Sequence, residues 1–388
     1  MHGIILSANK IYYMVLAVIG VPVNLLAIMV LSRGKCGLSS CTTCYLVAMA
    51  ASDLMVLISE VVLRQINAYY FPLSFLDITP VCSIIYVLST AATSCSVWFT
   101  VTFSFDRFVT ICCQKLKTKY CTKRNAVVVL STTCTVMCLM HVPFYFRYQP
   151  YTILYNLPWL CVSKPSYYSD PSWVGFKWFN TIFYPLLPFI LILLLNALTV
   201  RHIIVASRVR KGLRGQSKGE NHSDPEMASR RMSIILLFTI SGSFIILWSI
   251  YVINFICKII PGIYGVDENH SFYVFEQVGV MLVNLSCCTN AFIYGVTQSK
   301  FRYQIKKTAL EYQLTAVRQL DAEKQQAQPF VLFFFCLFWT RLVTKTSLPV
   351  TAFSVRFKAK CSKGDKTVSN QSDASHQVSV QQLAFILQ

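Results

Sequence analysis

Seven apolar runs, each close to the length of a membrane-spanning helix, are the feature that most constrains how this chain can fold. A helix needs about 20 consecutive apolar residues to cross the hydrocarbon core of a bilayer. The runs lie at 11–32, 41–63, 82–111, 126–146, 175–200, 233–257 and 273–296. Their number and lengths predict an all-α membrane protein that forms a seven-transmembrane helix bundle.

The amino-acid composition agrees with a membrane location. Of the 388 residues, 55% are hydrophobic and 13% are charged, whereas average soluble domains carry about 25% charged residues. A soluble protein with so few charges could not cover its surface with polar groups. The net charge of +19 is also typical of nucleic-acid-binding proteins, but the basic residues here lie in short blocks between apolar runs. We therefore attribute the charge to membrane topology and expect no nucleic-acid partner.

Basic residues concentrate in the loops on one side of the predicted bundle. The segments richest in Lys and Arg are 33–35, 115–124, 201–231 and 300–307. The loops on the other side mix the two signs, as where Lys258 is followed by Asp267 and Glu268. The positive-inside rule places the basic segments in the cytoplasm. We therefore predict a multi-pass plasma-membrane protein with an extracellular N-terminus, 1–10, and a cytoplasmic C-terminus.

One pair of cysteines and one sequon lie on the predicted outer face. Cys82 begins the third run and Cys161 lies in the loop 147–174. Because the cell exterior is oxidising, it permits a disulfide between them; two free thiols are the alternative. Asn269 begins the sequence Asn-His-Ser in the last outer loop, which predicts N-glycosylation there.

Three polar residues inside predicted spans could form an ion site. Asp53 lies in the second run, Ser96 in the third and Asn290 in the seventh. Ionisable groups inside a bilayer are costly and are therefore candidates for function. One carboxylate among neutral oxygen donors favours a small cation such as Na⁺ at Asp53. The alternative is a protonated or hydrogen-bonded packing residue.

Arg107 lies beside Asp106 at the cytoplasmic end of the third run. The two side chains could neutralise each other locally. An interfacial arginine that extends toward water is equally compatible with this position. Spacing alone does not decide between these interpretations.

Several short motifs follow one another along the seven runs. They are Gly20 with Asn24, Ser52-Asp53-Leu54, Asp106-Arg107-Phe108, Phe244 with Trp248, Asn290-Ala291-Phe292-Ile293-Tyr294 and Phe301-Arg302. Over about residues 11–307, their order and spacing resemble the rhodopsin-like (class A) G-protein-coupled receptors. The resemblance implies a receptor domain, 11–300, and a short amphipathic inner-face helix that starts at 301–307. We expect the rest, 308–388, to be a disordered or divergent cytoplasmic tail.

The resemblance implies a mechanism as well as a fold. In this family an extracellular ligand shifts the bundle between two states, span six moves outward at its inner end, and a heterotrimeric G protein inserts there. An agonist must bind the open state more tightly, since equal affinity for both states shifts nothing. Arrestin and a receptor kinase would be further partners, and no cofactor is implied apart from Na⁺. Basic residues at inner helix ends would also contact anionic membrane lipid.

Roles for individual residues follow from the same resemblance. Arg107, next to Phe108, would be released from Asp106 and contact the G protein. Leu116 would be a hydrophobic contact for the G protein, and Tyr294 would move inward to support the active state.

Two further groups complete the implied switch. Asp53, Ser96 and Asn290 would hold Na⁺ in the inactive state. Trp248 and Phe244 would couple the ligand pocket to span six.

The chain departs from the family pattern at several positions. Phe108 replaces the usual Tyr, and Ala291 replaces the Pro of span seven. Ile250 stands where span six usually has Pro, and Leu193 and Asn196 stand where span five would have Tyr. Because each missing proline restores a backbone hydrogen-bond donor, we expect a switch that is built differently.

The ligand pocket is predicted on the outer halves of spans three, six and seven. Its residues are Ser89, Thr90, Thr93, Trp248, Tyr251, Phe255, Met281 and Asn284. The upper third span has no aspartate, which argues against a charged-amine ligand. The aromatic residues favour a small aromatic or peptide-like ligand, while packing and interfacial-belt roles are the alternative.

Other functions of a seven-span protein are also considered. A transporter is expected to show inverted repeats, and the sequence shows none. An enzyme needs a catalytic cluster, whereas the six histidines are scattered without metal-ligand spacing. A receptor-like scavenger that does not couple to a G protein stays open, although its inner-face motif should be weak and Arg107 is intact. We predict a G-protein-coupled receptor that is not an enzyme.

Overall fold

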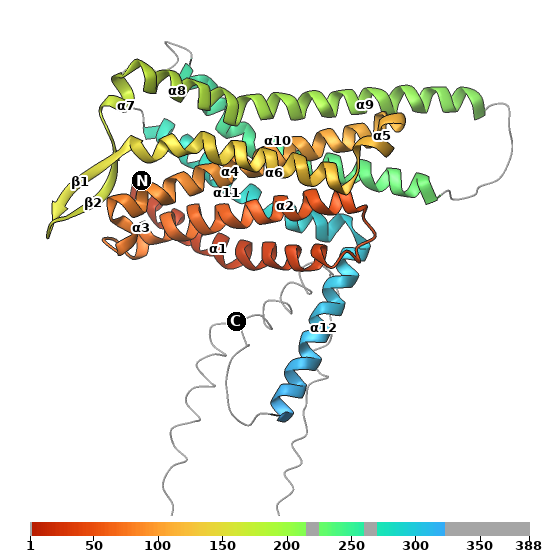
Figure 1. Cartoon of the computed structure of the whole chain (residues 1–388), viewed down its shortest axis with the longest axis horizontal. Coiled ribbons are helices and arrows are strands. Elements are labelled where there is room, and N and C mark those ends of the chain that lie inside the picture. Colours follow the sequence, from red (N-terminus) through yellow and green to blue (C-terminus); the bar gives the residue numbers. More distant parts are fainter. Residues whose placement is uncertain (1, 215–224, 260–269, 323–388) are drawn as a thin grey trace, which may run out of the picture. The chain divides into compact units, whose positions relative to one another are not determined.

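The computed structural model of the chain describes residues 2–214, 225–259 and 270–322. Asn269 and the tail from 323 onward lie outside the described residues. Within the described part, seven helices are long and apolar enough to cross a membrane. They run alongside one another in Figure 1, and the predicted seven-span helix bundle is thereby confirmed.

Each predicted apolar run lies within one of these helices. The spans are one (Ser7–Ser32), two (Ser40–Tyr70), three (Thr79–Cys112), four (Lys123–Arg147), five (Pro171–Val209), six (Arg230–Cys257) and seven (Tyr273–Thr297). We name the two ends of the bundle after residues of span three: the disulfide end contains Cys82 and the Arg107 end contains Arg107.

Four spans are single helices and three are composite. The single helices are α1 (His2–Ser32), α4 (Thr79–Cys112), α10 (Pro225–Ile259) and α11 (His270–Thr297). Span two consists of α2 (Ser40–Val56), a π-helical segment (Leu57–Ile66) and α3 (Asn67–Tyr70). Span four consists of α6 (Lys123–His141) and a 3₁₀ turn (Val142–Arg147). Span five consists of α8 (Pro171–Thr181), a π-helical segment (Ile182–Leu186) and α9 (Leu187–Arg214). Pro185 lies inside the second π-helical segment, where widened turns accommodate its missing N–H group.

Local sequence signals mark several helix starts. Ser39 caps α2 by accepting a hydrogen bond from the Thr42 amide at 3.2 Å, and Thr122 caps α6 at the Asn125 amide at 3.3 Å. Asp170 caps α8 and is followed directly by proline. These are the residue types that satisfy the otherwise unpaired N–H groups of a first helical turn.

Helix α4 is the element that most of the bundle packs around. It contacts α2, α6, α9 and α10. Near its middle, Val97 and Val101 pack with Ile192 of α9 and with Phe244 and Trp248 of α10 in one buried cluster. Span three therefore connects the two ends of the bundle and touches most of the helices that carry predicted site residues.

A β-hairpin between spans four and five is a feature that the sequence analysis did not predict. Strand β1 (Tyr148–Leu154) pairs antiparallel with β2 (Leu157–Ser163), and the hairpin projects at one end of the bundle (Figure 1). Tyr155 and Asn156 form its two-residue turn with φ angles of 53° and 59°. A pair of positive φ angles is what a twisted hairpin requires, but glycine usually supplies one of them.

The predicted disulfide fixes this hairpin to span three. Cys161 of β2 is bonded to Cys82 of α4, which confirms the pairing. The Thr79 hydroxyl also donates to the Leu160 carbonyl at 3.0 Å. The hairpin is thus held over the ends of spans two and three.

Helix α12 (Ser299–Ala322) follows span seven and runs across the direction of the spans (Figure 1). Phe301 and Ile305 are buried against the bundle. The guanidinium group of Arg302 donates to the carbonyls of Gly295 and Val296 at the end of α11. The helix starts close to the predicted 301–307 segment and continues to Ala322, past the expected start of the tail at 308.

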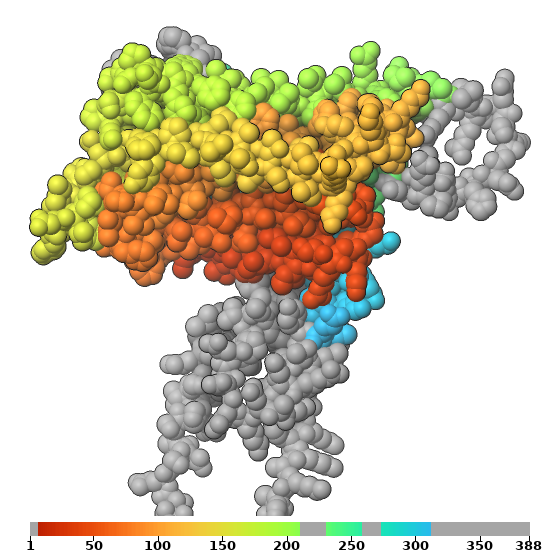
Figure 2. Space-filling view, viewed as in Figure 1, coloured from red at the N-terminus to blue at the C-terminus, as the bar shows by residue number. Residues whose placement is uncertain are grey.

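Side chains fill the space between spans one, two and four on the face shown in Figure 2. Within the bundle, Gly20 permits an especially close approach of span one to spans two and seven. A β-carbon placed on Gly20 of α1 would lie 2.4 Å from the Cys288 Sγ of α11 and 2.8 Å from a methyl group of Leu57. Small residues at such positions allow membrane helices to pack closely.

We expect Gly20→Ala to lower the melting temperature of the purified protein, because an overpacked helix contact costs about 1–3 kcal/mol. Gly242→Ala is the matched control, since a β-carbon at Gly242 of α10 would meet nothing within 4 Å. Thermal unfolding in detergent would compare the two. Equal melting temperatures would contradict the close packing of α1 described above.

Candidate functional site

A buried carboxylate in the middle of the bundle brings three spans together. Asp53 of span two is fully buried. Its Oδ1 accepts a hydrogen bond from the Ser96 hydroxyl of span three at 2.5 Å. Its Oδ2 accepts one from the Asn290 amide of span seven at 2.8 Å. The structure thus places the three residues predicted as ion ligands in direct contact.

A small cavity lies beside this cluster. Its volume of about 10 Å³ is close to the minimum needed by one water molecule. The lining residues are Ser96, Val97, Thr100, Ser243, Phe244, Trp248, Ser286, Thr289 and Asn290. Several of them offer hydroxyl or amide oxygens, which together with a carboxylate are the donors that hard cations prefer.

An aromatic group closes one side of the same cavity. Trp248 of span six is 2% exposed and donates through its ring N–H to the Ser286 hydroxyl of span seven at 3.2 Å. Its ring stacks on Phe244 at a centroid distance of 5.1 Å and meets Tyr184 and Tyr251 edge-on. Movement of span six therefore changes the wall of the polar cavity.

At the Arg107 end, the Asp106 and Arg107 side chains form an ion pair that is almost fully buried. The Cys41 thiol of span two donates to Asp106 Oδ1 at 3.2 Å, and the Arg107 guanidinium lies 5.5 Å from the centre of the Phe103 ring. Separating a buried pair leaves an uncompensated charge, which is strongly unfavourable unless a new partner or water receives it. The Arg107 side chain is therefore held in place by Asp106 in this structure.

Arg230 holds spans three and six together at the same end. Its guanidinium donates to the Ile111 carbonyl of α4 at 3.0 Å. From the sequence, Arg230 is only one of the basic residues of a predicted cytoplasmic segment, because nothing indicates that its side chain reaches a backbone carbonyl 119 residues away.

Tyr294 of span seven is completely buried. Its ring meets Phe301 of α12 edge-on at 6.2 Å. Among the described residues, its hydroxyl has no hydrogen-bond partner, which is rare for a buried polar group and often marks a functional position.

The other two predicted switch residues are more accessible than Tyr294. Phe108 is half-buried, and Leu116, on the short helix α5 (Gln114–Tyr120), is 52% exposed. Of the predicted switch residues, Leu116 is thus the most accessible.

Comparison with known families supports the arrangement found above. Residues 23–294, more than half of the chain, match the family model described as 7 transmembrane receptor (rhodopsin family). The chain belongs to the rhodopsin family. Its members are receptors rather than enzymes, so the residues above are to be understood as parts of a signalling bundle.

A second, larger cavity lies at the disulfide end of this rhodopsin-family bundle. It has a volume of about 400 Å³ and lies between span two, span three and the hairpin. Its lining residues are Leu63, Arg64, Asn67, Ala68, Leu76, Asp77, Cys82, Ile85, Tyr86, Tyr151, Leu160, Cys161 and Val162. The cavity is therefore walled in part by the disulfide that was predicted from sequence.

An ion pair in the π-helical segment of span two borders this cavity. The Glu60 carboxylate, which is 7% exposed, accepts hydrogen bonds from Arg64 Nε at 2.7 Å and from the Ser89 hydroxyl at 2.6 Å. The Arg64 guanidinium lies 5.1 Å from the centre of the Tyr86 ring. Glu60 was not among the predicted site residues, although an acid and a base four residues apart at the end of an apolar run were an available signal.

Tyr148 of the hairpin stacks on Tyr86 at 4.6 Å and extends this aromatic wall. Burial raises the pKa of Tyr148 to about 12. The hydroxyl of Tyr148 therefore stays neutral at physiological pH.

The predicted pocket residues occupy different environments. Ser89 donates to Glu60, whereas the hydroxyls of Thr90 and Thr93 donate to carbonyls of their own helix. Trp248 lines the smaller cavity, and Tyr251 contacts its ring. Asn284 is buried, and Phe255 and Met281 are half-buried. Neither of the two cavities described here is lined by the whole set, so the pocket stays a prediction.

We expect Glu60→Gln to lower the melting temperature, because hydrogen bonds to a charged group contribute about 1.5–3 kcal/mol and Arg64 would lose its counter-charge. The double variant Glu60→Gln/Arg64→Gln should recover part of the loss, since it removes both charges. A double-mutant cycle of thermal unfolding measures this coupling. Strict additivity of the two single substitutions would show that the pair does not act as a unit.

Proposed function

We propose that this rhodopsin-family chain binds an extracellular ligand and activates a heterotrimeric G protein by outward movement of span six. The observation that carries the proposal is the buried Asp106–Arg107 pair at the end of span three, where Arg230 of span six binds the Ile111 carbonyl, about one helical turn beyond Arg107. A buried arginine that becomes accessible only when a neighbouring helix moves is suited to recognising a partner in one state alone. In this proposal the Arg107 end faces the cytoplasm and the disulfide end faces the exterior.

Individual hydrogen bonds connect span six to spans three, five and seven within the described residues, and bonds of this kind can break and re-form in a two-state switch. Besides the Arg230 bond, the Ser241 hydroxyl donates to Asn196 Oδ1 of span five at 2.9 Å. Asn196 stands where a tyrosine was expected, and its bond to Ser241 fastens spans five and six. Tyr294, with its buried hydroxyl, is proposed to gain a partner when these contacts break. A ligand shifts the equilibrium only as far as its affinities for the two states differ.

Na⁺ is proposed to stabilise the closed state at Asp53, with Ser96 and Asn290 as further oxygen ligands. The small cavity beside them supports this assignment, since its size suits a single small ion or water. Because Trp248 and Phe244 wall the same cavity, its occupation would resist movement of span six.

The larger cavity at the disulfide end supports a compact ligand with aromatic or peptide-like character. Tyr86, Tyr151 and Leu160 provide apolar surface, and Arg64 provides a charged donor. Of the predicted pocket residues, Ser89 is connected to this cavity through Glu60, which pairs with the lining residue Arg64. The segments FDRFVTICCQKLKTKYCT and LILLLNALTVRHI are similar to fish receptors named probable G-protein coupled receptor 139, and such receptors are associated with aromatic amino acids.

Arrestin, a receptor kinase and anionic lipid are proposed as further partners at the Arg107 end. The exposed Leu116 and the basic residues of α5 support a protein or lipid contact there. No observation on the described residues favours a transporter or a ligand scavenger.

We expect Arg230→Ala to raise basal nucleotide exchange on a G protein. A hydrogen bond from a charged donor contributes about 1.5–3 kcal/mol, so its loss should lower the ratio of closed to open receptor by about ten- to a hundredfold. The double variant Arg230→Ala/Arg107→Ala should fall back to background, since Arg107 is the proposed contact for the G protein. The assay uses purified receptor in nanodiscs with representatives of each G-protein class, and it needs no known ligand.

The neighbouring Arg231→Ala is the matched control, because Arg231 is exposed and should leave basal exchange unchanged. A rise of the same size in the control would assign the effect to loss of charge alone. If neither the wild type nor any variant stimulated a G protein, although all were folded and incorporated into nanodiscs, the proposed G-protein coupling would be disproved.

We expect NaCl to raise the melting temperature of the receptor relative to an equal concentration of choline chloride, because a bound ion stabilises the state that binds it. Asp53→Asn should abolish this difference, and Asp77→Asn, at the disulfide end, should preserve it. The same sodium effect in wild type and Asp53→Asn would rule out Asp53 as the ion ligand.

A further inference from the structure

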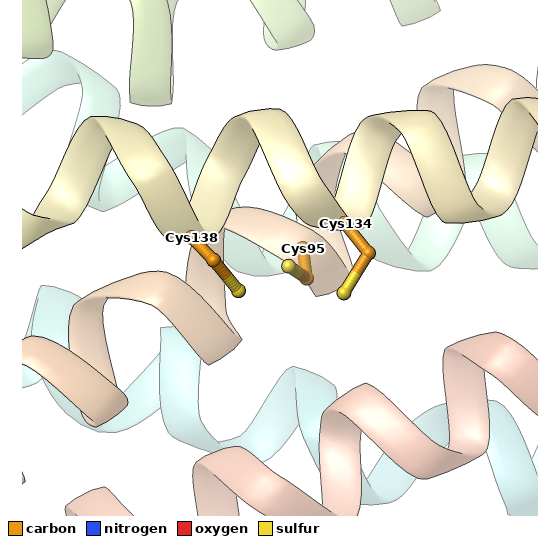
Figure 3. A group of neighbouring side chains, drawn as sticks. All are labelled: Cys95, Cys134 and Cys138. Atoms are coloured by element: carbon orange, nitrogen blue, oxygen red, sulfur yellow. The ribbon is translucent and has the colours of Figure 1, made fainter.

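Three cysteine thiols meet between spans three and four (Figure 3). The sulfur atoms of Cys95 on α4 and of Cys134 and Cys138 on α6 all lie within 4.8 Å of one another. These residues lie near the middle of their spans, where neither an ion nor a displaced proton has a route to water. We therefore regard them as small packing side chains. A ligand from solution needs a site that water reaches, and the cavity at the disulfide end meets this requirement.

Arg64 is the positively charged residue among those that line this cavity. Its side chain is 30% exposed. A guanidinium group has five N–H donors, and Arg64 gives two of them, from Nε and Nη2, to the Glu60 carboxylate. Among the described residues, no other acceptor is found for Arg64, which leaves three donors for a ligand in the cavity.

Glu60 holds the Arg64 side chain in a fixed orientation. Its carboxylate also accepts hydrogen bonds from Gln65 Nε2 at 3.1 Å and from the Ser89 hydroxyl at 2.6 Å, so the four acceptor positions of a carboxylate are all used. The guanidinium also lies over the Tyr86 ring. An arginine that is positioned in advance loses less conformational freedom when it binds a ligand.

The free donors of Arg64 are suited to a carboxylate, because a planar guanidinium can bind one through two parallel N–H···O bonds. Asp77 lines the same cavity and limits the charge of the ligand. Since Glu60 already offsets the charge of Arg64, and Asp77 adds a negative charge, a ligand with one negative charge is favoured over a phosphate or sulfate dianion.

A cationic ligand is less well matched to the cavity. The two oxygens of Asp77 already accept hydrogen bonds, from the Asn67 side chain at 2.8 Å and from the Ser74 backbone N–H at 3.2 Å. An ammonium group in the cavity would also meet the free donors of Arg64, which repel it.

The remaining walls of the cavity select an apolar or aromatic body for the ligand. Ile85 of span three and Leu160 of the hairpin provide apolar surface, and Tyr151, which is 72% exposed, provides an aromatic ring. The volume of about 400 Å³ lies in the lower part of the range for small-molecule sites, about 300–1,000 Å³. A compact body therefore fits between the hairpin and span three.

We propose that the ligand of this receptor carries a single carboxylate, which Arg64 binds, on a compact apolar or aromatic body. This ligand class rests on the proposed function, because it concerns the cavity that was assigned there to the extracellular ligand. Glu60 joins Arg64 to Ser89 of span three, so the carboxylate site is connected to the helix that carries Arg107. A free organic acid and the C-terminus of a peptide both supply the required group.

The test measures the melting temperature of the full-length receptor in nanodiscs with benzoate, phenylacetate and hydrocinnamate. Each acid is compared with its primary amide, which has nearly the same shape and no charge, and with the amine of the same body. A compound that binds the folded state raises the melting temperature according to its affinity. We expect the acids to stabilise at concentrations about tenfold lower than the amides and amines, since hydrogen bonds between charged groups are the stronger ones.

A second pair of probes separates the two sources of the carboxylate. The tripeptide Gly-Gly-Phe is compared with its C-terminal amide. Stabilisation by the tripeptide at lower concentrations than by the simple acids would support a peptide C-terminus, and the reverse order would support a free organic acid. Equal stabilisation by acids and their amides, or none by any acid, would overturn the proposal.

The double variant Glu60→Gln/Arg64→Gln should bind the acids about tenfold or more weakly, and it avoids leaving one charge unpaired. Arg147→Gln is the matched control. Arg147 contacts the rings of Tyr148 and Tyr167 but does not line the cavity, so its loss should leave acid binding unchanged. Acid binding of equal strength in the wild type and the double variant would exclude Arg64 as the recognition group.

These binding measurements use no G protein, so a failure of the ligand class is distinguishable from a failure of the proposed signalling. Acid binding without stimulated nucleotide exchange would contradict the coupling and leave the carboxylate site intact. Basal exchange that depends on Arg107, in a receptor that binds none of the acids, would contradict the carboxylate site alone.

Discussion

The contacts of Asp53 are the interaction on which the centre of this bundle depends. A carboxylate with no access to water must be satisfied by protein groups or by an ion. Ser96 and Asn290 supply donors from spans three and seven, so the requirement of one side chain fixes the mutual depth of three helices. Hydrophobic packing alone cannot do this within lipid, where apolar side chains gain little from contact with one another.

At the Arg107 end a buried charge is also neutralised by a protein group, but the partner lies on the same helix. Asp106 neutralises Arg107 from the next position on the same helix, so this pair does not itself tie two spans together. The connection to span six comes instead from Arg230 and a backbone carbonyl. The buried carboxylate thus fixes the centre of the bundle, whereas at the Arg107 end span six is joined to span three through a side-chain bond to backbone, which is consistent with the proposed opening at that end.

The sequence predicted those features that depend on residue type and order. The seven spans follow from length and hydropathy, and the Cys82–Cys161 disulfide followed from its being the one obvious pair on the outer face. Features that depend on packing were missed. Glu60 lies within an apolar run, and its hydroxyl partner, Ser89, is 29 residues away. The hairpin turn uses Tyr155 and Asn156 rather than a glycine.

Without the family's prolines, spans six and seven are continuous α-helices. Irregular helix occurs instead in spans two and five, as the π-helical segments around Glu60 and Pro185. Span six is a continuous helix, and it approaches span seven closely where a β-carbon on Gly279 would lie 3.3 Å from the Tyr251 Cα atom. A straight helix held this tightly near one end cannot bend at a proline. In the proposed movement, the end where Arg230 makes its bond would separate while the Gly279 contact near the other end is kept, and Trp248, which lies between the two, would move with the helix.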